Sequence, residues 1–220
     1  KYMGDAIMAF WNAPLDEPDH AKSACAAALA MLERLGQLNA ELADEARQAG
    51  RAHMPIAIGI GLNTAICCVG NMGSQQRFDY SVLGDGVNLA SRLEGQTKAY
   101  GVAALIGQET RSLAPDFAAL EVDLIRVKGK TEPARVYALL GGPERARSDA
   151  FRALDALQSG FLVAYRAAQW DAAERALAQL RAAGGVELAG LCAVYAERIA
   201  AFRRHPPPPG WDGVHVAEAK

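Results

Sequence analysis

The polar and apolar positions of the first 50 residues predict a short hairpin followed by a long helix. The opening stretch KYMGDAIMAFW places Gly4 between two short apolar runs, a pattern typical of two strands joined by a glycine turn. Pro18 stands near the start of a segment with helical apolar spacing, and Gly50 ends it. The apolar positions of this helix are Ala21, Ala24, Cys25, Ala28, Leu29, Leu32 and Leu35.

Residues 54–142 alternate between predicted strands and a further helix. The run MPIAIGIGLNTAICCVG is rich in glycine and β-branched residues, which predicts a buried strand leading into a tight loop. RFDYSVLGDGVNLASRLEGQTKAYG predicts a strand, a turn at Gly84, and a helix that Asp85 can cap and Gly101 can end. VAALIG, LEVDLIRVKGK and ARVYALLGG predict three more strands. Strands interleaved with helices indicate an α/β domain built around one sheet.

The composition changes at GGPERARS. Residues 146–204 are rich in Ala, Leu and Arg and predict three helices, divided near residues 168–169 and 184–185. FLVAYRAAQWDAAERALAQL has the aromatic and alanine spacing of a tetratricopeptide-like hairpin, but one such unit is too little for a solenoid. We therefore expect a small all-α appendage over residues 143–205. Four consecutive prolines in HPPPPGWDGVHVAEAK predict an extended tail over residues 206–220.

Charge and cysteine content narrow the class of protein. The formal net charge is −2 and the basic residues form no long run, so nucleic acid and anionic membrane surfaces are not expected partners. The 4 cysteines include no C-x-x-C pair of the kind that binds zinc, and they indicate buried side chains in a reducing compartment. The longest apolar run, ACAAALAML, is far shorter than the roughly 20 residues of a membrane-spanning helix. A cytoplasmic location is expected.

Two side chains of the second predicted helix could bind a ligand together. Asn88 and Arg92 stand four residues apart and therefore lie on one face, away from the apolar stripe. An amide and a guanidinium projecting together suit phosphate or sugar oxygens. From the spacing alone, a solvated polar face with Arg92 paired to a nearby acid is the favoured interpretation.

Two predicted turns also carry candidate ligand-binding side chains. Gly4 before Asp5 lets the backbone approach a ligand and exposes the carboxylate, which can help to hold Mg²⁺, although acids are also common in turns. Lys128 and Lys130 flank a glycine in a predicted hairpin-like turn. Their amines could meet phosphates, although exposed lysines are frequent at such positions.

Four stretches together resemble a known family. KYMGDAIMAFW, GIGLNTAICCVGNMGS, RFDYSVLGDGVNLASRLEGQTKAYGV and RVKGKTEPARVYAL, in this order, resemble the class III nucleotidyl cyclase catalytic domain over residues 1–142, in particular that of bacterial adenylate cyclases. The resemblance implies a ferredoxin-like α/β (α+β) sandwich that works as a homodimer with shared active sites. It implies conversion of ATP to 3′,5′-cyclic AMP and pyrophosphate in intracellular signalling, with two Mg²⁺ or Mn²⁺ ions per site.

The resemblance also assigns roles to residues at the base and metal sites. Lys1 matches the residue that reads the purine, where a Lys goes with adenine and a Glu with guanine. Ser81 falls at the second purine-reading position. Asp5 matches the second of the two metal-binding aspartates.

The same comparison places four further side chains along the nucleotide. Asn88 matches the amide that positions the ribose, and Arg92 matches the guanidinium that stabilises the α-phosphate as charge builds up. Lys128 or Lys130 matches the lysine that holds the terminal phosphates, and the sequence does not choose between them.

The sequence departs from the family pattern in two places. The first metal-binding aspartate of the family lies in a segment with the pattern F-x-D-[IV]-x-G-[FY]-[ST], which these 220 residues do not contain. The chain is therefore expected to be an N-terminally truncated domain that lacks its first strand and half of the metal site. Ala65 stands where the family usually has Gly, and its methyl group is expected to bend the loop slightly.

Three other functions compete with an adenylate cyclase. A guanylate cyclase is disfavoured by Lys1. A non-catalytic, cyclase-like dimerisation module is disfavoured for the intact protein by Asn88 and Arg92, but favoured for a chain with half a metal site. The third is a protein-binding adaptor over residues 146–204, which would need the following aromatic side chains to be exposed: Phe151, Phe161, Tyr165 and Trp170.

Membrane attachment is expected only through residues upstream of Lys1.

Overall fold

A mixed five-stranded sheet forms the centre of the molecule. The computed structural model describes residues 1–74, 78–126 and 133–216, so Lys128 and Lys130 lie outside the described residues. The sheet has the order β3-β6-β8-β7-β9, in which β8 is antiparallel to both neighbours and the two edge pairs are parallel. Its strands are β3 (Ile60–Leu62), β6 (Ala104–Gly107), β7 (Ala118–Arg126), β8 (Ala134–Gly141) and β9 (His215–Val216).

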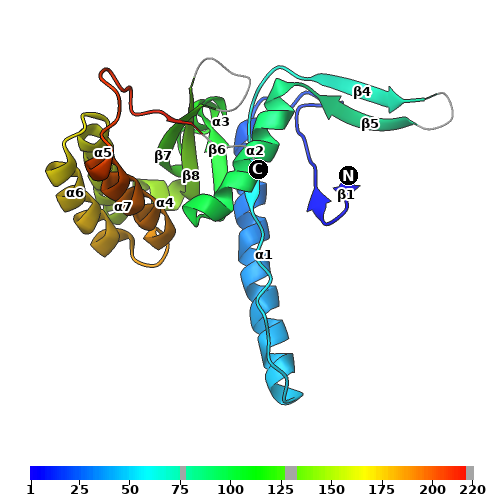
Figure 1. Cartoon of the computed structure of the whole chain (residues 1–220). Helices are drawn as coiled ribbons and strands as arrows, with labels where there is room; N and C mark the ends of the chain where they lie inside the picture. The colour runs from blue at the N-terminus through cyan, green and yellow to red at the C-terminus, as the bar shows by residue number, and fades with distance from the viewer. Residues whose placement is uncertain (75–77, 127–132, 217–220) are drawn as a thin grey trace.

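Helices cover both faces of this sheet, as Figure 1 shows. Along β6, Leu105 belongs to one buried core while Ala104 and Ile106 belong to the other, because successive strand residues point to opposite faces. Helix α1 (His20–Gln48) contributes Cys25 to the core of Ala104 and Ile106, which also contains Ala114, the residue directly after α3 (Gln108–Leu113). Helix α2 (Asp85–Tyr100) and the C-terminal helices share the core of Leu105. The predicted α+β architecture is confirmed.

Two hairpins stand apart from the sheet. Strands β1 (Tyr2–Met3) and β2 (Ala6–Ile7) pair antiparallel around Gly4, whose φ of +65° suits glycine, as the sequence predicts. Strands β4 (Cys68–Gly73) and β5 (Phe78–Leu83) form a longer antiparallel arm. Figure 1 shows this arm reaching away from the body on the side opposite α5–α7, with the N-terminal hairpin beside it.

The C-terminal residues form the predicted helices and pack on the sheet. Helices α5 (Asp149–Arg166), α6 (Trp170–Gly184) and α7 (Ala189–Arg204) break where the sequence predicts, and a short helix α4 (Pro143–Arg147), which was not predicted, precedes them. Ser148 caps α5 by accepting a hydrogen bond from the Phe151 N–H at 3.1 Å. Phe161 and Tyr165 are buried, and Trp170 stacks on Phe202 with centroids 5.4 Å apart. Burial of these aromatic rings counts against the adaptor interpretation. No helix of the described residues is long and apolar enough to span a bilayer.

One cap prediction is wrong. Helix α2 begins at Asp85, and its N-cap is Gly84, with a φ of +152° that residues with a side chain rarely adopt. Asp85 therefore occupies the first helical turn, where a carboxylate still interacts favourably with the helix dipole. The other end is as predicted, because Gly101 adopts a left-handed conformation with a φ of +65°.

The buried strand predicted within MPIAIGIGLNTAICCVG is only three residues long, and its side chains are half-buried. Only Ile60–Leu62 pairs with β6, and the preceding residues are mostly exposed. The side chain of Asn39 on α1 accepts a hydrogen bond from the N–H of Ile56 and donates one to its carbonyl, both at 2.8 Å. Because this amide satisfies the backbone groups that a neighbouring strand would use, the segment lies along α1.

Buried tyrosines predict a loss of stability at alkaline pH. Burial raises the pKa of Tyr165 to about 12, and burial together with Asp123 raises the pKa of Tyr100 and Tyr195 above the ordinary value. The unfolded chain loses these protons near pH 10 and the folded chain does not, so the free energy of unfolding falls as pH rises above about 10.

This prediction is checked by the absorbance of ionised tyrosine, followed together with far-UV circular dichroism. Of the 6 tyrosines, these three are expected to ionise only with the loss of helix signal, whereas in denaturant all six titrate near pH 10. Burial also raises the pKa of Tyr137. Only Tyr2 and Tyr80 therefore remain to ionise first. Ionisation of all six near pH 10 with an intact helix signal would contradict it.

Candidate active site

The two residues that the family resemblance assigns to the purine lie next to each other. Lys1 Nζ donates a hydrogen bond to Ser81 Oγ at 3.3 Å, although 80 positions separate the two residues. Lys1 Nζ also lies 3.8 Å from Asp79 Oδ2. The lysine comes from the N-terminal hairpin, whereas the serine and the aspartate both come from β5. The amine, hydroxyl and carboxylate thus offer donors and acceptors within one small region.

Backbone and ring contacts hold Lys1 at this position. The Met8 N–H donates to the Lys1 carbonyl at 2.9 Å, which extends the pairing of β1 and β2 by one step. Beyond the hairpin, the Phe10 ring lies 5.9 Å from the ring of Tyr80 on β5, measured between centroids. The N-terminal segment is therefore attached to the β4–β5 arm at two points.

Asn88 and Arg92 both project from the exposed face of α2. Both side chains are exposed, and in the described part of the chain no acid lies within ion-pair distance of Arg92. The alternative in which Arg92 pairs with a neighbouring acid is therefore not what the described residues form. A guanidinium and an amide on one open helix face can bind the same oxygen-rich ligand.

The position of α2 depends on Asn63, Gly61 and Gly86, which have no individual signal in the sequence, and on Ala65. Asn63 Nδ2 donates to the Gly86 carbonyl at 3.1 Å and so fixes the first turn of the helix. A β-carbon on Gly61 would lie 2.1 Å from the Ala90 carbonyl oxygen, so β3 and α2 touch through their backbones. A β-carbon on Gly86 would lie 2.4 Å from that of Ala65, so the methyl group of Ala65 fills the space above a glycine.

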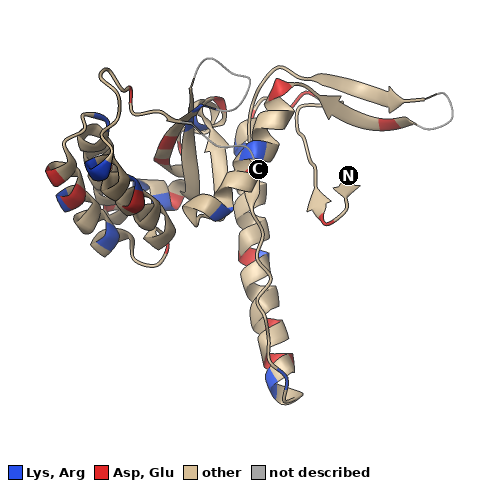
Figure 2. Cartoon of the chain, in the orientation of Figure 1, with Lys and Arg blue, Asp and Glu red and all other residues tan. Residues whose placement is uncertain are grey.

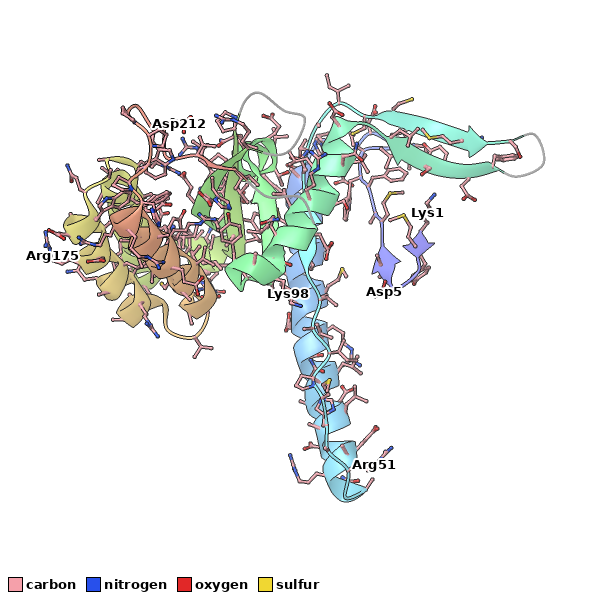
Figure 3. The ribbon with its side chains drawn as sticks, in the orientation of Figure 1. Lys1, Asp5, Arg51, Lys98, Arg175 and Asp212 are labelled. Carbon is pink, nitrogen blue, oxygen red and sulfur yellow. The ribbon has the colours of Figure 1, made fainter. Side chains whose placement is uncertain are left out.

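Asp5 lies at the exposed turn of the N-terminal hairpin, and Figure 3 shows it at the tip, with Lys1 at the opposite end of the same hairpin. No group of three or more His, Cys, Asp or Glu side chains able to hold a metal occurs among the described residues. Mg²⁺ sites normally combine one or two carboxylates with substrate phosphates, so Asp5 fits part of such a site.

The described residues thus form two separate parts of the predicted site. Lys1 and Ser81 meet beside β5, while Asn88 and Arg92 lie on α2, and no described hydrogen bond or ion pair joins either part to Asp5. The spacing of Asn88 and Arg92 predicted their common face. The contact between Lys1 and Ser81 has no local sequence signal.

Comparisons with known proteins identify the family of the chain. The family described as "Adenylate and Guanylate cyclase catalytic domain" matches residues 1–141. Adenylate cyclase 1 of Rhizobium meliloti (strain 1021) is 34% identical over 142 residues, which cover 64% of this chain and 20% of that protein. Among solved structures, the adenylyl cyclase CyaB from P. aeruginosa is 32% identical with a TM-score of 0.54, covering 64% of this chain and 70% of that one. The guanylyl cyclase Cya2 is 30% identical with a TM-score of 0.54, covering 64% and 68%.

The fold and the matched residues define a class III nucleotidyl cyclase domain, so the resemblance seen in the sequence is confirmed. The chain belongs to the adenylate and guanylate cyclase catalytic domain family. It spans only 20% of the length of Adenylate cyclase 1 of Rhizobium meliloti (strain 1021). It spans 27% of the length of the adenylate cyclase of Anabaena cylindrica, to which it is 38% identical over 144 residues that cover 62% of this chain.

Proposed function

We propose that this chain is the catalytic domain of an adenylate cyclase, which converts ATP to 3′,5′-cyclic AMP and pyrophosphate. The observation that carries the proposal is the 3.3 Å contact between Lys1 Nζ and Ser81 Oγ, at the positions assigned to the purine. A protonated amine donates to a ring nitrogen of adenine, and a hydroxyl accepts from the exocyclic amine. Guanine offers a ring N–H donor at the first of these places, which an ammonium group cannot accept.

Asn88 and Arg92 would act on the ribose and the α-phosphate. In the reaction, the 3′-oxygen bonds to the α-phosphorus, the bond from that phosphorus to the bridging oxygen breaks, and the 3′-hydroxyl proton leaves to solvent or a base. Arg92 donates to the phosphoryl oxygens, whose negative charge rises in the transition state. Asn88 holds the ribose so that its 3′-oxygen faces the phosphorus.

Asp5 would contribute a carboxylate ligand to bound Mg²⁺ or Mn²⁺. When bound, such ions lower the pKa of an attacking hydroxyl and neutralise a pyrophosphate leaving group. Substrate phosphates and further carboxylates complete sites of this kind.

A homodimer is the proposed active form. Figure 2 shows few charged positions on the N-terminal hairpin and the β4–β5 arm, whereas both signs of charge alternate over α5–α7. The hairpin and the arm instead expose large apolar side chains, which typically mark an interface. These side chains are Tyr2, Ile7, Phe78, Tyr80 and Leu83. A second copy of the chain would cover them.

Product analysis tests the substrate. Cyclic nucleotide is measured from ATP and from GTP, with Mg²⁺ and with Mn²⁺, on protein that includes any native residues before Lys1. Cyclic AMP from ATP is the expected product. Lys1→Glu should lower kcat/KM for ATP by about 10- to 100-fold, the effect of losing one hydrogen bond from a charged donor.

Arg175→Glu provides the matched control, because it makes the same charge change at an exposed position on α6. It should leave kcat/KM for ATP unchanged. Cyclic GMP as the main product would reject the adenine assignment and retain the fold. No product from either nucleotide, in a preparation shown to be dimeric, would reject the enzyme and favour a regulatory module.

A further inference from the structure

A bulge in β7 is the point at which the C-terminal helices attach to the cyclase sheet. The pairing of β7 with β8 shifts between Glu121 and Asp123, so that Val122 has no partner on β8. Side chains from the helices bind the backbone here. Gln158 Nε2 on α5 donates to the Glu121 carbonyl, and Tyr195 Oη on α7 donates to the Val122 carbonyl, both at 2.6 Å.

The carboxylate of Asp123 joins this bulge to two helices. Asp123 is 1% exposed, and its Oδ2 accepts hydrogen bonds from Tyr100 Oη and from Arg198 Nη1, both at 2.6 Å. The other oxygen accepts the Leu124 N–H at 2.8 Å. Arg198 Nη2 donates to Tyr100 Oη at 3.3 Å, which closes a triangle of bonds between β7, α2 and α7. Although burial opposes the charged form, Asp123 raises the pKa of Arg198 above its ordinary value.

A backbone contact lies beside this triangle. A β-carbon on Gly101, at the end of α2, would lie 2.8 Å from the Gly190 Cα in the first turn of α7. A β-carbon on Gly190 would likewise lie 2.7 Å from the Gly101 Cα. Only glycine at both positions allows the two helices to approach this closely, so α7 packs directly against the C-terminal end of α2.

Helix α2 carries the effect of this junction to the candidate site. Tyr100 is its last residue, and Arg92 lies eight positions earlier, about 12 Å along the helix axis. An α-helix of this length moves largely as a rigid body, so a change in its C-terminal anchor alters the direction of Arg92. A displacement of about 1 Å at a reacting centre can cost about 100-fold in rate.

We propose that Arg198 is a positioning residue for Arg92: through Asp123 and Tyr100 it fixes the C-terminal end of α2, and thereby the guanidinium that meets the α-phosphate. The inference rests on the proposed cyclase function. It assigns the helices that follow the cyclase domain a part in the geometry of the site. Arg198 touches no substrate and acts only through α2.

Steady-state kinetics on Arg198→Lys tests the proposal, because lysine keeps the charge but loses the fork that reaches Asp123 and Tyr100 together. We expect kcat to fall about 10-fold with KM for ATP within about twofold, since the purine-reading residues lie on other elements. In an Arg92→Ala background the same change should lower kcat by less than about twofold. The control Arg203→Met removes another arginine of α7, one that pairs with Glu174 of α6 at 2.9 Å, and should leave kcat unchanged.

The proposal fails if Arg198→Lys lowers kcat by the same factor with and without Arg92, which is what a loss of folded protein would give. The paired variant Asp123→Asn/Arg198→Met leaves no buried charge unpaired. It replaces Arg198→Lys in the same kinetic comparison if Arg198→Lys does not fold. If wild-type protein makes no cyclic nucleotide, the proposed function fails separately. Hydrogen exchange then decides: faster exchange over residues 86–93 in Arg198→Lys but not in Arg203→Met supports positioning, and unchanged exchange rejects it.

Discussion

Arg92→Ala is expected to lower kcat for cyclic AMP formation by about 10²- to 10³-fold, the usual effect of removing one donor aimed at a developing oxyanion. Alanine leaves the charge on the α-phosphoryl oxygens without this partner in the transition state. Arg92 is exposed on α2, so its loss should not change the fold. Cyclic AMP production at saturating ATP measures the loss of kcat. The circular dichroism spectrum and the thermal midpoint check that the fold is unchanged.

Arg175→Ala serves as the control, because Arg175 is exposed on α6, on the helical side of the molecule labelled in Figure 3. It should retain full activity.

A second experiment tests the proposed homodimer. Because the family resemblance implies active sites shared between the two subunits, Asp5 would come from one subunit and Arg92 from the other. An equal mixture of Arg92→Ala and Asp5→Ala chains should recover about a quarter of wild-type activity, since half of the dimers then hold one intact site. Full kcat in Arg92→Ala would show that this arginine does not contact the reacting phosphate.

Local signals in the sequence predicted the elements that carry the site. A glycine between two short apolar runs predicts the hairpin around Gly4, and a glycine after a helical pattern predicts the left-handed end of α2 at Gly101. The spacing of four residues predicts the common face of Asn88 and Arg92. These features depend on backbone preferences within a few residues, so the sequence expresses them directly. The cap predicted at Asp85 is wrong because Gly84, one residue earlier, already supplies the turn into the helix.

Contacts between distant segments could not be predicted in the same way. Lys1 meets Ser81 only because the hairpin and the β4–β5 arm lie side by side, and no periodicity encodes that distance. The sequence does not predict the bulge at Val122 either, because residues 118–126 show an ordinary strand pattern. Its consequence is large, because a bulge leaves backbone groups that other elements can bind. The family resemblance assigns roles to Lys1 and Ser81, but it assigns none to the residues at the β7 bulge.

Arg198→Met is expected to lower the free energy of unfolding by about 3–5 kcal/mol, the usual cost of removing one partner from a buried ion pair. Asp123 is 1% exposed and the Arg198 side chain 15% exposed, so water does not replace the lost guanidinium. Tyr100 Oη and the Leu124 N–H remain as donors, but neither carries a charge. Urea denaturation followed by circular dichroism should show a lower midpoint with an unchanged slope.

The paired variant Asp123→Asn/Arg198→Met separates the cost of an unpaired charge from the value of the ion pair. With both charges removed, the loss of stability should be clearly smaller than in Arg198→Met alone, because an amide can remain hydrogen-bonded to Tyr100 without a counter-charge. Arg203→Met should leave the midpoint almost unchanged, since exposed ion pairs contribute little. Equal losses in Arg198→Met and Arg203→Met would show that the triangle of bonds at the β7 bulge does not hold α7 against the sheet.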